Sequence, residues 1–183
     1  VALRYAAERP GTTDPRLVGV AAVCAPLDLD RGATALDGPG TWLYRRYILP
    51  GLRKQVDAVE KLRPVPCDRD RRARARGIRE WDSLVVAPRW GFASAEDYYA
   101  RASVAPMLDR IALPAWIIES ENDPMVPAWT LTSALARVSS TTEVTWTPRG
   151  GHVGMPADLD LGRPGAKGLH AQLLAWIATK LSS

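Results

Sequence analysis

The chain has 183 residues, of which 46% are hydrophobic and 24% charged, so it is long and apolar enough to bury one full hydrophobic core. Its net charge of +4 is mild and does not indicate a nucleic-acid partner. No run approaches the roughly eighteen apolar residues of a membrane span, the first residues become charged too early for a signal peptide, and the two cysteines, Cys24 and Cys67, give no disulfide framework, so we expect a cytoplasmic protein.

The N-terminal residues predict a helix followed by a strand. The opening VALRYAAERPG carries the apolar spacing of a helix. The stretch from Leu17 to Leu29, LVGVAAVCAPLDL, begins as a continuous apolar run rich in valine and then meets Pro26 and Asp28. Such a run is typical of a buried strand that ends in a loop.

The middle of the chain has a different pattern. From about Arg31 to Ser103 no apolar run is long enough for a strand. Three segments look helical instead, namely TWLYRRYILPGLRKQV, DRDRRARARGIREWDSL and SAEDYYARAS. We therefore expect residues 31–103 to form a helical insertion between two strands of the sheet.

A run of arginines lies within this insertion. Six arginines fall within eleven residues: Arg69, Arg71, Arg72, Arg74, Arg76 and Arg79. Such a run can bind nucleic acid or anionic lipid, or it can belong to a solvated helix. No aromatic residues alternate with these arginines, so we favour the solvated helix and expect no nucleic-acid partner.

The second half of the chain alternates strands and helices. An apolar run from Ala115 to Ile118 and the alternating TEVTWT, which stops at Pro148, predict two further strands. WTLTSALARV predicts a helix between them, and GLHAQLLAWIATKL predicts a closing helix with an apolar stripe formed by Leu169, Leu173, Trp176 and Ile177. Alternating strands and helices indicate the α/β class, with a parallel sheet and helices on its faces.

Two polar residues follow successive strands of this predicted sheet. Asp123 comes just after the Ala115–Ile118 run, and His152 follows the TEVTWT strand within the glycine-rich TPRGGHVGMP. A right-handed crossover brings the ends of adjacent parallel strands to the same edge of the sheet. A carboxylate beside an imidazole can hold the ring in one tautomer and stabilise the imidazolium, which is the orienting half of a catalytic triad.

Each of these residues also has a structural interpretation. An isolated histidine in a glycine-rich turn is more often a capping or surface residue, and "NDP" is an ordinary turn signal. The order of the pair, each residue after its own strand, favours catalysis over these alternatives. The other histidine, His170, is predicted to lie on the surface of the closing helix. With two histidines and two scattered cysteines, the sequence predicts no metal site and no cofactor.

Several motifs together resemble a known family. ENDPMVP and RGGHVG resemble the late strands of the α/β-hydrolase superfamily. APLDL (Ala25–Leu29), YRRYIL (Tyr44–Leu49) and IREWDSLVVAPRWGFASAEDYYARAS (Ile78–Ser103) resemble, in order and spacing, the YheT-like family, which is related to the ABHD-type esterases and phospholipases. The resemblance covers almost the whole chain.

This resemblance implies a fold and two roles. Residues 1–183 would form the C-terminal part of one α/β-hydrolase domain, with residues 31–103 as its helical lid. Asp123 would be the triad acid and His152 the general base. The superfamily places its nucleophilic serine in a G-x-S-x-G elbow, a motif that this sequence lacks. Because the opening resembles the helix that follows the elbow, we expect the serine to lie upstream of Val1.

A nucleophile inside the chain is the alternative. Cys24 follows the first strand, but AVCAPL offers no glycine-flanked elbow and no helix after it, so a buried structural cysteine is the better interpretation. The serines likewise lack an elbow: Ser94, Ser103, Ser120, Ser139 and Ser140.

The function that these observations favour is hydrolysis of a carboxylic ester, with a small-molecule or lipid-like substrate. Two alternatives remain: a non-catalytic fragment acting as a folded or oligomeric binding module, and a dehalogenase or epoxide hydrolase with aspartate at the elbow. A fragment would expose a sheet edge and would need a partner, either a second copy or the missing N-terminal half. The aromatic residues of the insertion are expected mostly to pack within it; they are Trp42, Tyr44, Tyr47, Trp90, Tyr98 and Tyr99.

Overall fold

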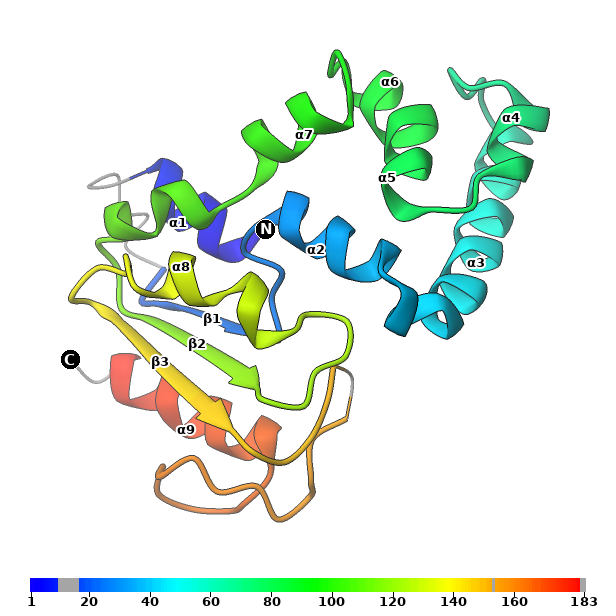
Figure 1. Cartoon of the computed structure of the whole chain (residues 1–183). Helices are drawn as coiled ribbons and strands as arrows, with labels where there is room; N and C mark the ends of the chain where they lie inside the picture. Colours follow the sequence, from blue (N-terminus) through cyan, green and yellow to red (C-terminus); the bar gives the residue numbers. More distant parts are fainter. Residues whose placement is uncertain (10–16, 153, 182–183) are drawn as a thin grey trace. The chain divides into compact units, whose positions relative to one another are not determined.

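The computed structural model describes residues 1–9, 17–152 and 154–181. The chain divides into two compact units. The sheet unit combines Val1–Asp28 with Val104–Ser183, and the helical unit is Leu29–Ser103. Figure 1 labels the elements of both units.

Among the described residues, the sheet unit contains three parallel strands in the order β1-β2-β3. They are β1 (Val20–Val23), β2 (Ala115–Ser120) and β3 (Thr142–Thr147). The predicted parallel sheet of the α/β class is thereby confirmed. The first strand is shorter than its apolar run, because Cys24 adopts a left-handed backbone with φ of 47° and ends the extended segment.

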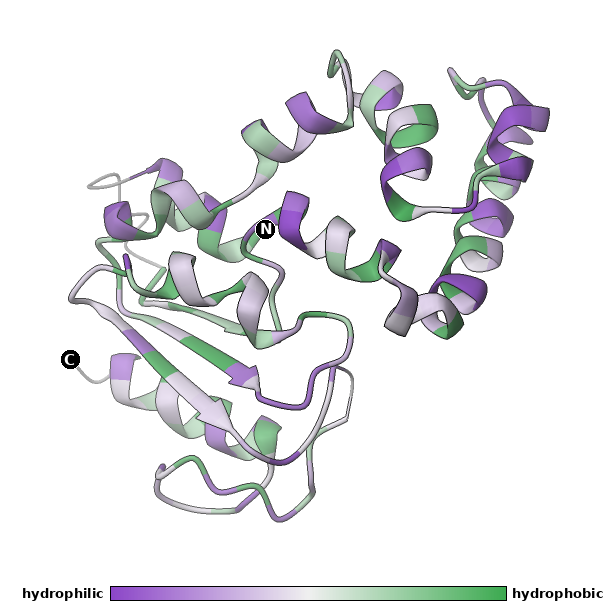
Figure 2. Ribbon diagram, viewed as in Figure 1, coloured by the Kyte–Doolittle hydropathy of each residue, from purple (hydrophilic) through white to green (hydrophobic). Residues whose placement is uncertain are grey.

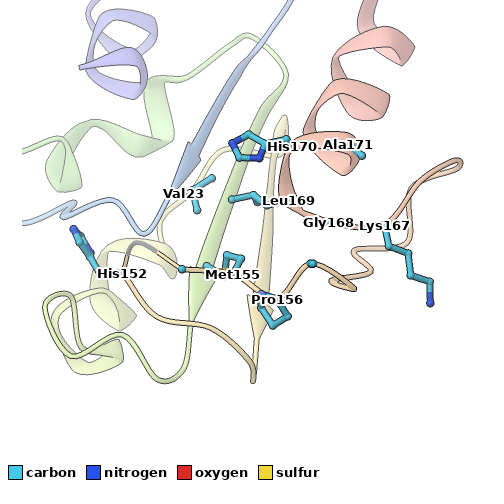
Figure 3. A pocket seen from close by; sticks show the side chains of 11 residues that line it. Val23, His152, Met155, Pro156, Lys167, Gly168, Leu169, His170 and Ala171 are labelled. Carbon is cyan, nitrogen blue, oxygen red and sulfur yellow. The ribbon is translucent and has the colours of Figure 1, made fainter.

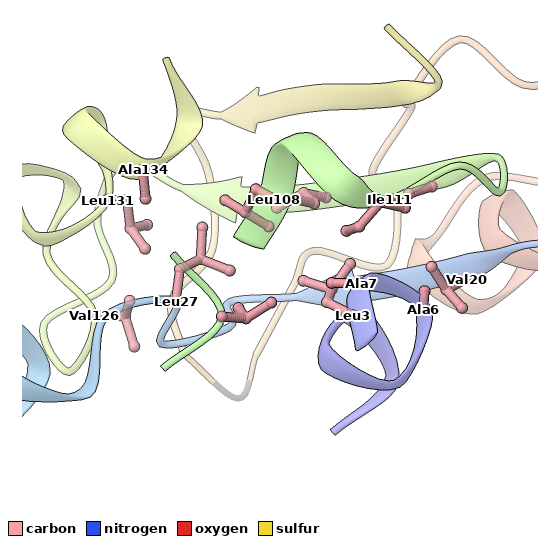
Figure 4. Packing of buried hydrophobic residues seen from close by; sticks show 13 residues of the cluster. Leu3, Ala6, Ala7, Val20, Leu27, Leu108, Ile111, Val126, Leu131 and Ala134 are labelled. Carbon is pink, nitrogen blue, oxygen red and sulfur yellow. The ribbon is translucent and has the colours of Figure 1, made fainter. Parts of the chain in front are cut away.

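Helices cover both faces of this sheet, and β2 is buried along its whole length. Ala115 and Ile117 pack on the side of α1 (Ala2–Glu8), in the cluster drawn in Figure 4. Trp116 and Ile118 point to the opposite side, where they pack with residues of α9 (Leu169–Leu181). Figure 2 shows the apolar body of β2 becoming hydrophilic where the strand ends.

The helix predicted between the second and third strands is much shorter than its sequence pattern. It consists of a 3₁₀ turn, η4 (Ala128–Thr130), and a single helical turn, α8 (Thr132–Leu135). The hydroxyl of Thr130 donates to the Pro127 carbonyl and that of Thr132 to the Ala128 carbonyl. Such side-chain bonds to the backbone compete with regular helix.

The remaining helices of the sheet unit are largely as predicted. Helix α1 matches the opening pattern, although Pro10 and Gly11 of that pattern lie outside the described residues. A 3₁₀ segment, η3 (Ala105–Arg110), precedes β2. The stripe predicted for α9 was wrong at one position, because Ile177 is 38% exposed.

Among the described residues, the helical unit contains helices and no strand. The assignment of residues 31–103 as a lid inserted in the hydrolase domain stays a prediction. The elements of the unit are α2 (Leu29–Asp37), η1 (Pro39–Thr41), α3 (Trp42–Glu60), α4 (Arg69–Arg74), α5 (Ile78–Trp81), η2 (Asp82–Val86), α6 (Ala87–Trp90) and α7 (Ala95–Ala102). The helix-like segment DRDRRARARGIREWDSL breaks between α4 and α5. The carboxylate of Asp37 accepts the N–H groups of Ile78 and Arg79 and so caps the start of α5.

Hydrogen bonds join the residues at the two ends of the helical segment, and also the residues of the sheet unit that flank it. The backbone N–H of Leu29 donates to the hydroxyl of Ser103 at 3.0 Å within the helical unit. In the sheet unit, the N–H groups of Val104 and Ala105 donate to the carbonyl of Leu27 at 3.0 and 2.9 Å. The helical segment therefore leaves and re-enters the sheet unit at one place.

The arginine run takes part in the internal structure of the helical unit. Arg72 is 1% exposed and pairs with the carboxylates of Asp57 and Glu60. Arg79 pairs with Asp30 and with Glu96. At these two positions the basic run therefore serves the fold.

Candidate active site

Asp123 is held in a tight turn directly after β2. Its Oδ1 accepts the backbone N–H groups of Met125 at 2.8 Å and Val126 at 3.0 Å. These two bonds orient the carboxylate, and the residue is only 3% exposed. The "NDP" segment therefore forms a turn, as the structural alternative predicts. The turn uses only Oδ1 and leaves Oδ2 available to another partner.

His152 lies in the loop after β3, which is tied to the loop after β2. The Ser120 hydroxyl donates to the Gly150 carbonyl at 3.0 Å, and the Asn122 side-chain amide donates to the Pro148 carbonyl at 2.6 Å. Gly150 has φ of 109°, and a Cβ there would lie 3.0 Å from the Gly154 carbonyl oxygen. A side chain at position 150 is therefore disfavoured both by the conformation and by the close approach of this carbonyl.

The two loops bring Asp123 and His152 together. The His152 Nδ1 lies 2.9 Å from the Asp123 Oδ2. The Asp123 side chain is fully buried, whereas the His152 side chain is 27% exposed. With Nδ1 donating to the carboxylate, Nε2 is the unprotonated nitrogen of the neutral ring and can accept a proton.

Cys24 is buried beside this pair, at the end of β1. Its Sγ donates to the Gly151 carbonyl at 3.6 Å. Burial, together with the charges of Asp123 and Glu119, raises the pKa of the Cys24 thiol to about 12. A thiol that holds its proton so strongly is a poor nucleophile, which agrees with the structural interpretation of this cysteine.

Glu119 is a buried acid that the reasoning from sequence missed. It is completely inaccessible to solvent and lies in β2, four residues before Asp123. Its Oε1 accepts the Ala25 N–H at 3.2 Å, whereas Oε2 has no hydrogen-bond partner among the described residues. Burial, reinforced by the charge of Asp123, raises the pKa of Glu119 to about 8. A glutamate inside the apolar run AWIIES was the available signal.

The serines considered as replacements for the nucleophile are used in local structure. The Ser120 hydroxyl is bonded to Gly150 and to the Asn122 N–H, and Ser94 caps α7. The Ser103 hydroxyl donates to the Tyr99 carbonyl. Ser139 bonds to neighbouring threonine hydroxyls. These contacts place none of these four serines in an elbow between a strand and a helix.

An open pocket of about 520 Å³ borders His152 (Figure 3). The loop after β3 lines it with Met155 and Pro156, and the start of α9 lines it with Leu169 and His170. His170 is exposed on α9, as predicted, and also reaches this pocket, which the sequence did not indicate. The described residues hold no group of three or more His, Cys, Asp or Glu side chains suited to a metal ion.

No helix within the described ranges has the length and apolar character needed to cross a membrane.

Comparison with known proteins identifies several relatives. The chain is 33% identical over 136 residues to YheT of Escherichia coli K12, which is provisionally named an esterase; the match covers 72% of this chain and 39% of YheT. It is 26% identical over 121 residues to human phospholipase ABHD3, covering 66% of this chain and 30% of that protein. The protein slr0264 of Synechocystis, also provisionally named an esterase, is 29% identical over 143 residues, which cover 76% of this chain and 39% of slr0264.

The chain thus spans less than half the length of these relatives. No family model matches it. In a comparison with the crystal structure of the α/β hydrolase GrgF from Penicillium, the matched part covers 83% of this chain and 52% of the GrgF chain, with 17% identity and a TM-score of 0.40. The parallel sheet with helices on both faces, the order of its motifs and the relatives named above agree on one assignment. The chain belongs to the YheT-like family of α/β hydrolases and forms part of an α/β-hydrolase fold.

Proposed function

We propose that this chain supplies the acid and the base of a serine hydrolase that cleaves carboxylic esters. Asp123 is the triad acid and His152 the general base. The observation that carries the proposal is the 2.9 Å contact between the His152 Nδ1 and the buried Asp123 Oδ2. This contact leaves Nε2 as the proton acceptor on the more exposed side of the pair.

The proposed reaction follows from this geometry. A serine hydroxyl oxygen bonds to the acyl carbon while its proton passes to the His152 Nε2. The C–O bond to the alcohol then breaks, and the alcohol takes that proton as it leaves. Water repeats the sequence on the acyl-enzyme, with His152 taking the proton of water and returning one to the serine. Asp123 remains ionised and stabilises the imidazolium at both stages.

The nucleophilic serine is proposed to lie upstream of Val1. Two observations support this placement. The serines discussed above are bonded within turns and helix ends, and the matched segment is only 39% of YheT and 30% of human ABHD3. The relatives therefore have ample chain outside the matched segment to hold a nucleophile.

The proposed substrates are small-molecule or lipid-like esters. The names of the relatives, esterase for YheT and phospholipase for ABHD3, support this class. The pocket beside His152 has apolar walls from Met155, Pro156 and Leu169, which suit an acyl or alkyl group. Cytoplasmic location, and a partner that is a second copy or the missing N-terminal half, stay predictions.

We further propose that residues 31–103 act as a lid. The segment is inserted between β1 and β2 and forms a unit of its own. It was expected to bury most of its aromatic side chains, but Trp42, Tyr47 and Trp90 are 56%, 85% and 71% exposed. Exposed aromatic side chains of this kind are suited to contact an apolar substrate.

The test compares the 183-residue chain with a longer protein that adds the upstream segment. A fluorophosphonate probe and p-nitrophenyl butyrate are offered to both. We expect no adduct and no turnover with the chain alone, and both with the longer protein. In the longer protein, His152→Ala should lower kcat/KM by about a thousandfold or more.

Two results would overturn the proposal. A stoichiometric adduct with turnover on the 183-residue chain would place the nucleophile inside it. A loss of less than about tenfold in His152→Ala would remove the histidine from the mechanism. If neither protein reacts, the chain is not part of a serine hydrolase, and the binding module and the hydrolase with aspartate at the elbow become the explanations to test.

A further inference from the structure

Three acidic groups are buried together beneath His152, and the proposed mechanism uses only one of them. Asp123 is 3% exposed, Cys24 is 2% exposed, and Glu119 is not exposed at all. They come from the ends of β1 and β2. Glu119 stands out because Oε2 is buried without a partner among the described residues.

The contacts of these groups close a ring that includes His152. Glu119 Oε1 accepts the Ala25 N–H at 3.2 Å, which fixes the turn after β1. In that turn Cys24 has a φ of 47°, and its Sγ donates to the Gly151 carbonyl at 3.6 Å. The next residue, His152, bonds back to Asp123, which follows Glu119 on the same chain segment.

The left-handed backbone at Cys24 is costly for a residue with a side chain. It persists only where surrounding contacts hold it, and such strain tends to occur at functional sites. Here the contacts are the Ala25 bond to Glu119 on one side and the thiol bond to Gly151 on the other. The strained turn therefore links Glu119 to the loop that carries His152.

The charges of the cluster are not balanced by cations. In the described part of the chain, no lysine or arginine side chain is paired with Glu119 or Asp123. An ionised carboxylate that is buried without a cation costs far more free energy than a neutral carboxyl group. Two adjacent buried carboxylates would add repulsion to that cost.

We propose that Glu119 is a positioning residue that carries its proton, holding the strained turn against the His152 loop while leaving Asp123 as the single charged acid beside the imidazole. The inference takes Asp123 and His152 to be the acid and base of the proposed function. Its test reads the histidine ring directly and requires no turnover, so that a failure of either proposal can be told from a failure of the other.

The groups that influence Glu119 are few. Asp123, after β2, raises the pKa of Glu119 by its charge, and the Ala25 N–H, after β1, lowers it. Cys24 faces the same acids and keeps its thiol protonated, so it contributes no charge at neutral pH. Ionisation of Glu119 should therefore be sensed by the Asp123–His152 pair as one added negative charge.

The experiment is an NMR titration of the 183-residue chain from pH 5 to pH 10. The ring nitrogens of His152 are followed by long-range proton–nitrogen correlation, and a His170→Ala variant assigns the two histidines. We expect the wild-type His152 signals to show an inflection near pH 8, because burial raises the pKa of Glu119 to about 8. Glu119→Gln should keep the Nδ1–H tautomer and lose this inflection.

A matched control is Glu121→Gln, which makes the same change at an exposed acid two residues away and should keep the inflection near pH 8. Glu119→Leu removes the bond to Ala25 and should lower the population of the Nδ1–H tautomer; if that variant does not fold, Glu119→Gln still decides. An inflection near pH 8 that persists in Glu119→Gln, or that is absent from the wild type, overturns the proposal.

Discussion

The two units of this chain bury polar groups in opposite ways. In the helical unit the guanidinium of Arg72 is 1% exposed and is paired with two carboxylates, those of Asp57 and Glu60. In the sheet unit the carboxyls of Glu119 and Asp123 are buried beside the thiol of Cys24 with an excess of acid. A buried charge with its partners present is explained by the fold, whereas a buried acid with an unused oxygen calls for another explanation.

The arginine run and the acids at the strand ends differ in how fully the fold uses them. The arginine run dominates the sequence, yet Arg72 and Arg79 are used in ion pairs that hold helices together. The acids at the strand ends are scattered in the sequence and only the fold brings them together. The function is therefore better sought where polar groups are left incompletely satisfied.

The largest expected effect is at Asp123. In the longer protein, Asp123→Asn should lower kcat/KM for an ester by about a thousandfold or more, because the amide no longer fixes the Nδ1–H tautomer of His152. Steady-state ester hydrolysis measures it. Asp109→Asn, at an exposed acid on η3, is the control and should retain the rate. Equal rates in the two variants would contradict the assigned role.

The next prediction concerns Arg72 and its two carboxylate partners in the helical unit. Replacing both partners, Asp57→Asn with Glu60→Gln, leaves the buried Arg72 without a counter-charge. We expect the midpoint of urea unfolding to fall, because a buried guanidinium without a counter-charge destabilises the folded state. Urea unfolding followed by tryptophan fluorescence measures it. Asp158→Asn, which removes an exposed pair with Arg149, should leave the stability nearly unchanged. Similar losses of stability in both variants would show that the burial of Arg72 does not make its ion pairs more important than an exposed one.

The third prediction concerns the pH dependence of stability. Folding raises the pKa of Glu119 to about 8, so the folded state binds the proton more tightly than the unfolded state. The contribution is fully present below the ordinary pKa of about 4.5 and is lost as the pH rises through about 8. The wild type should therefore lose stability relative to Glu119→Gln across this range, by at most about 1.4 kcal/mol per pH unit. Urea unfolding of both proteins at several pH values tests it, and parallel curves would refute it.

The smallest effect tests the strained turn. At Cys24, with φ of 47°, glycine should be more stable than alanine by about 1 kcal/mol, because the left-handed backbone costs glycine nothing. At Ala22, inside β1, the order should reverse, since glycine weakens a regular strand by a similar amount. Urea unfolding of Cys24→Gly, Cys24→Ala and Ala22→Gly gives the comparison. The same sign at both positions would mean that the turn is not strained.

Much of the sheet unit could be predicted because its signals are local. Continuous apolar runs marked β1 and β2, alternation marked β3, and the polar residues after two strands indicated Asp123 and His152. The resemblance of several ordered motifs gave the family. Glu119 was missed because one acid inside an apolar run reads as a strand residue, and its burial depends on what packs around it.

The sequence of the helical unit predicts helical segments, but it does not predict where they break or which charged residues are buried. The break before α5 depends on the Asp37 carboxylate, which lies 41 residues before Ile78 in the sequence. The burial of Arg72 depends on acids in α3, and nothing in DRDRRARAR separates that arginine from its neighbours. Long-range side-chain contacts of this kind cannot be derived from periodicity.

The two ends of the helical segment 29–103 lie close together, and this has a consequence for evolution and for engineering. The Leu27 carbonyl accepts the N–H groups of Val104 and Ala105, and the Leu29 N–H donates to the Ser103 hydroxyl. The first and last residues of the helical segment therefore lie next to each other. Segments attached in this way can be lengthened, exchanged between relatives or replaced by a short turn without changing the register of β1 on β2. The proposed lid can therefore vary between relatives while Asp123 and His152, the proposed acid and base, keep their places in the sheet unit.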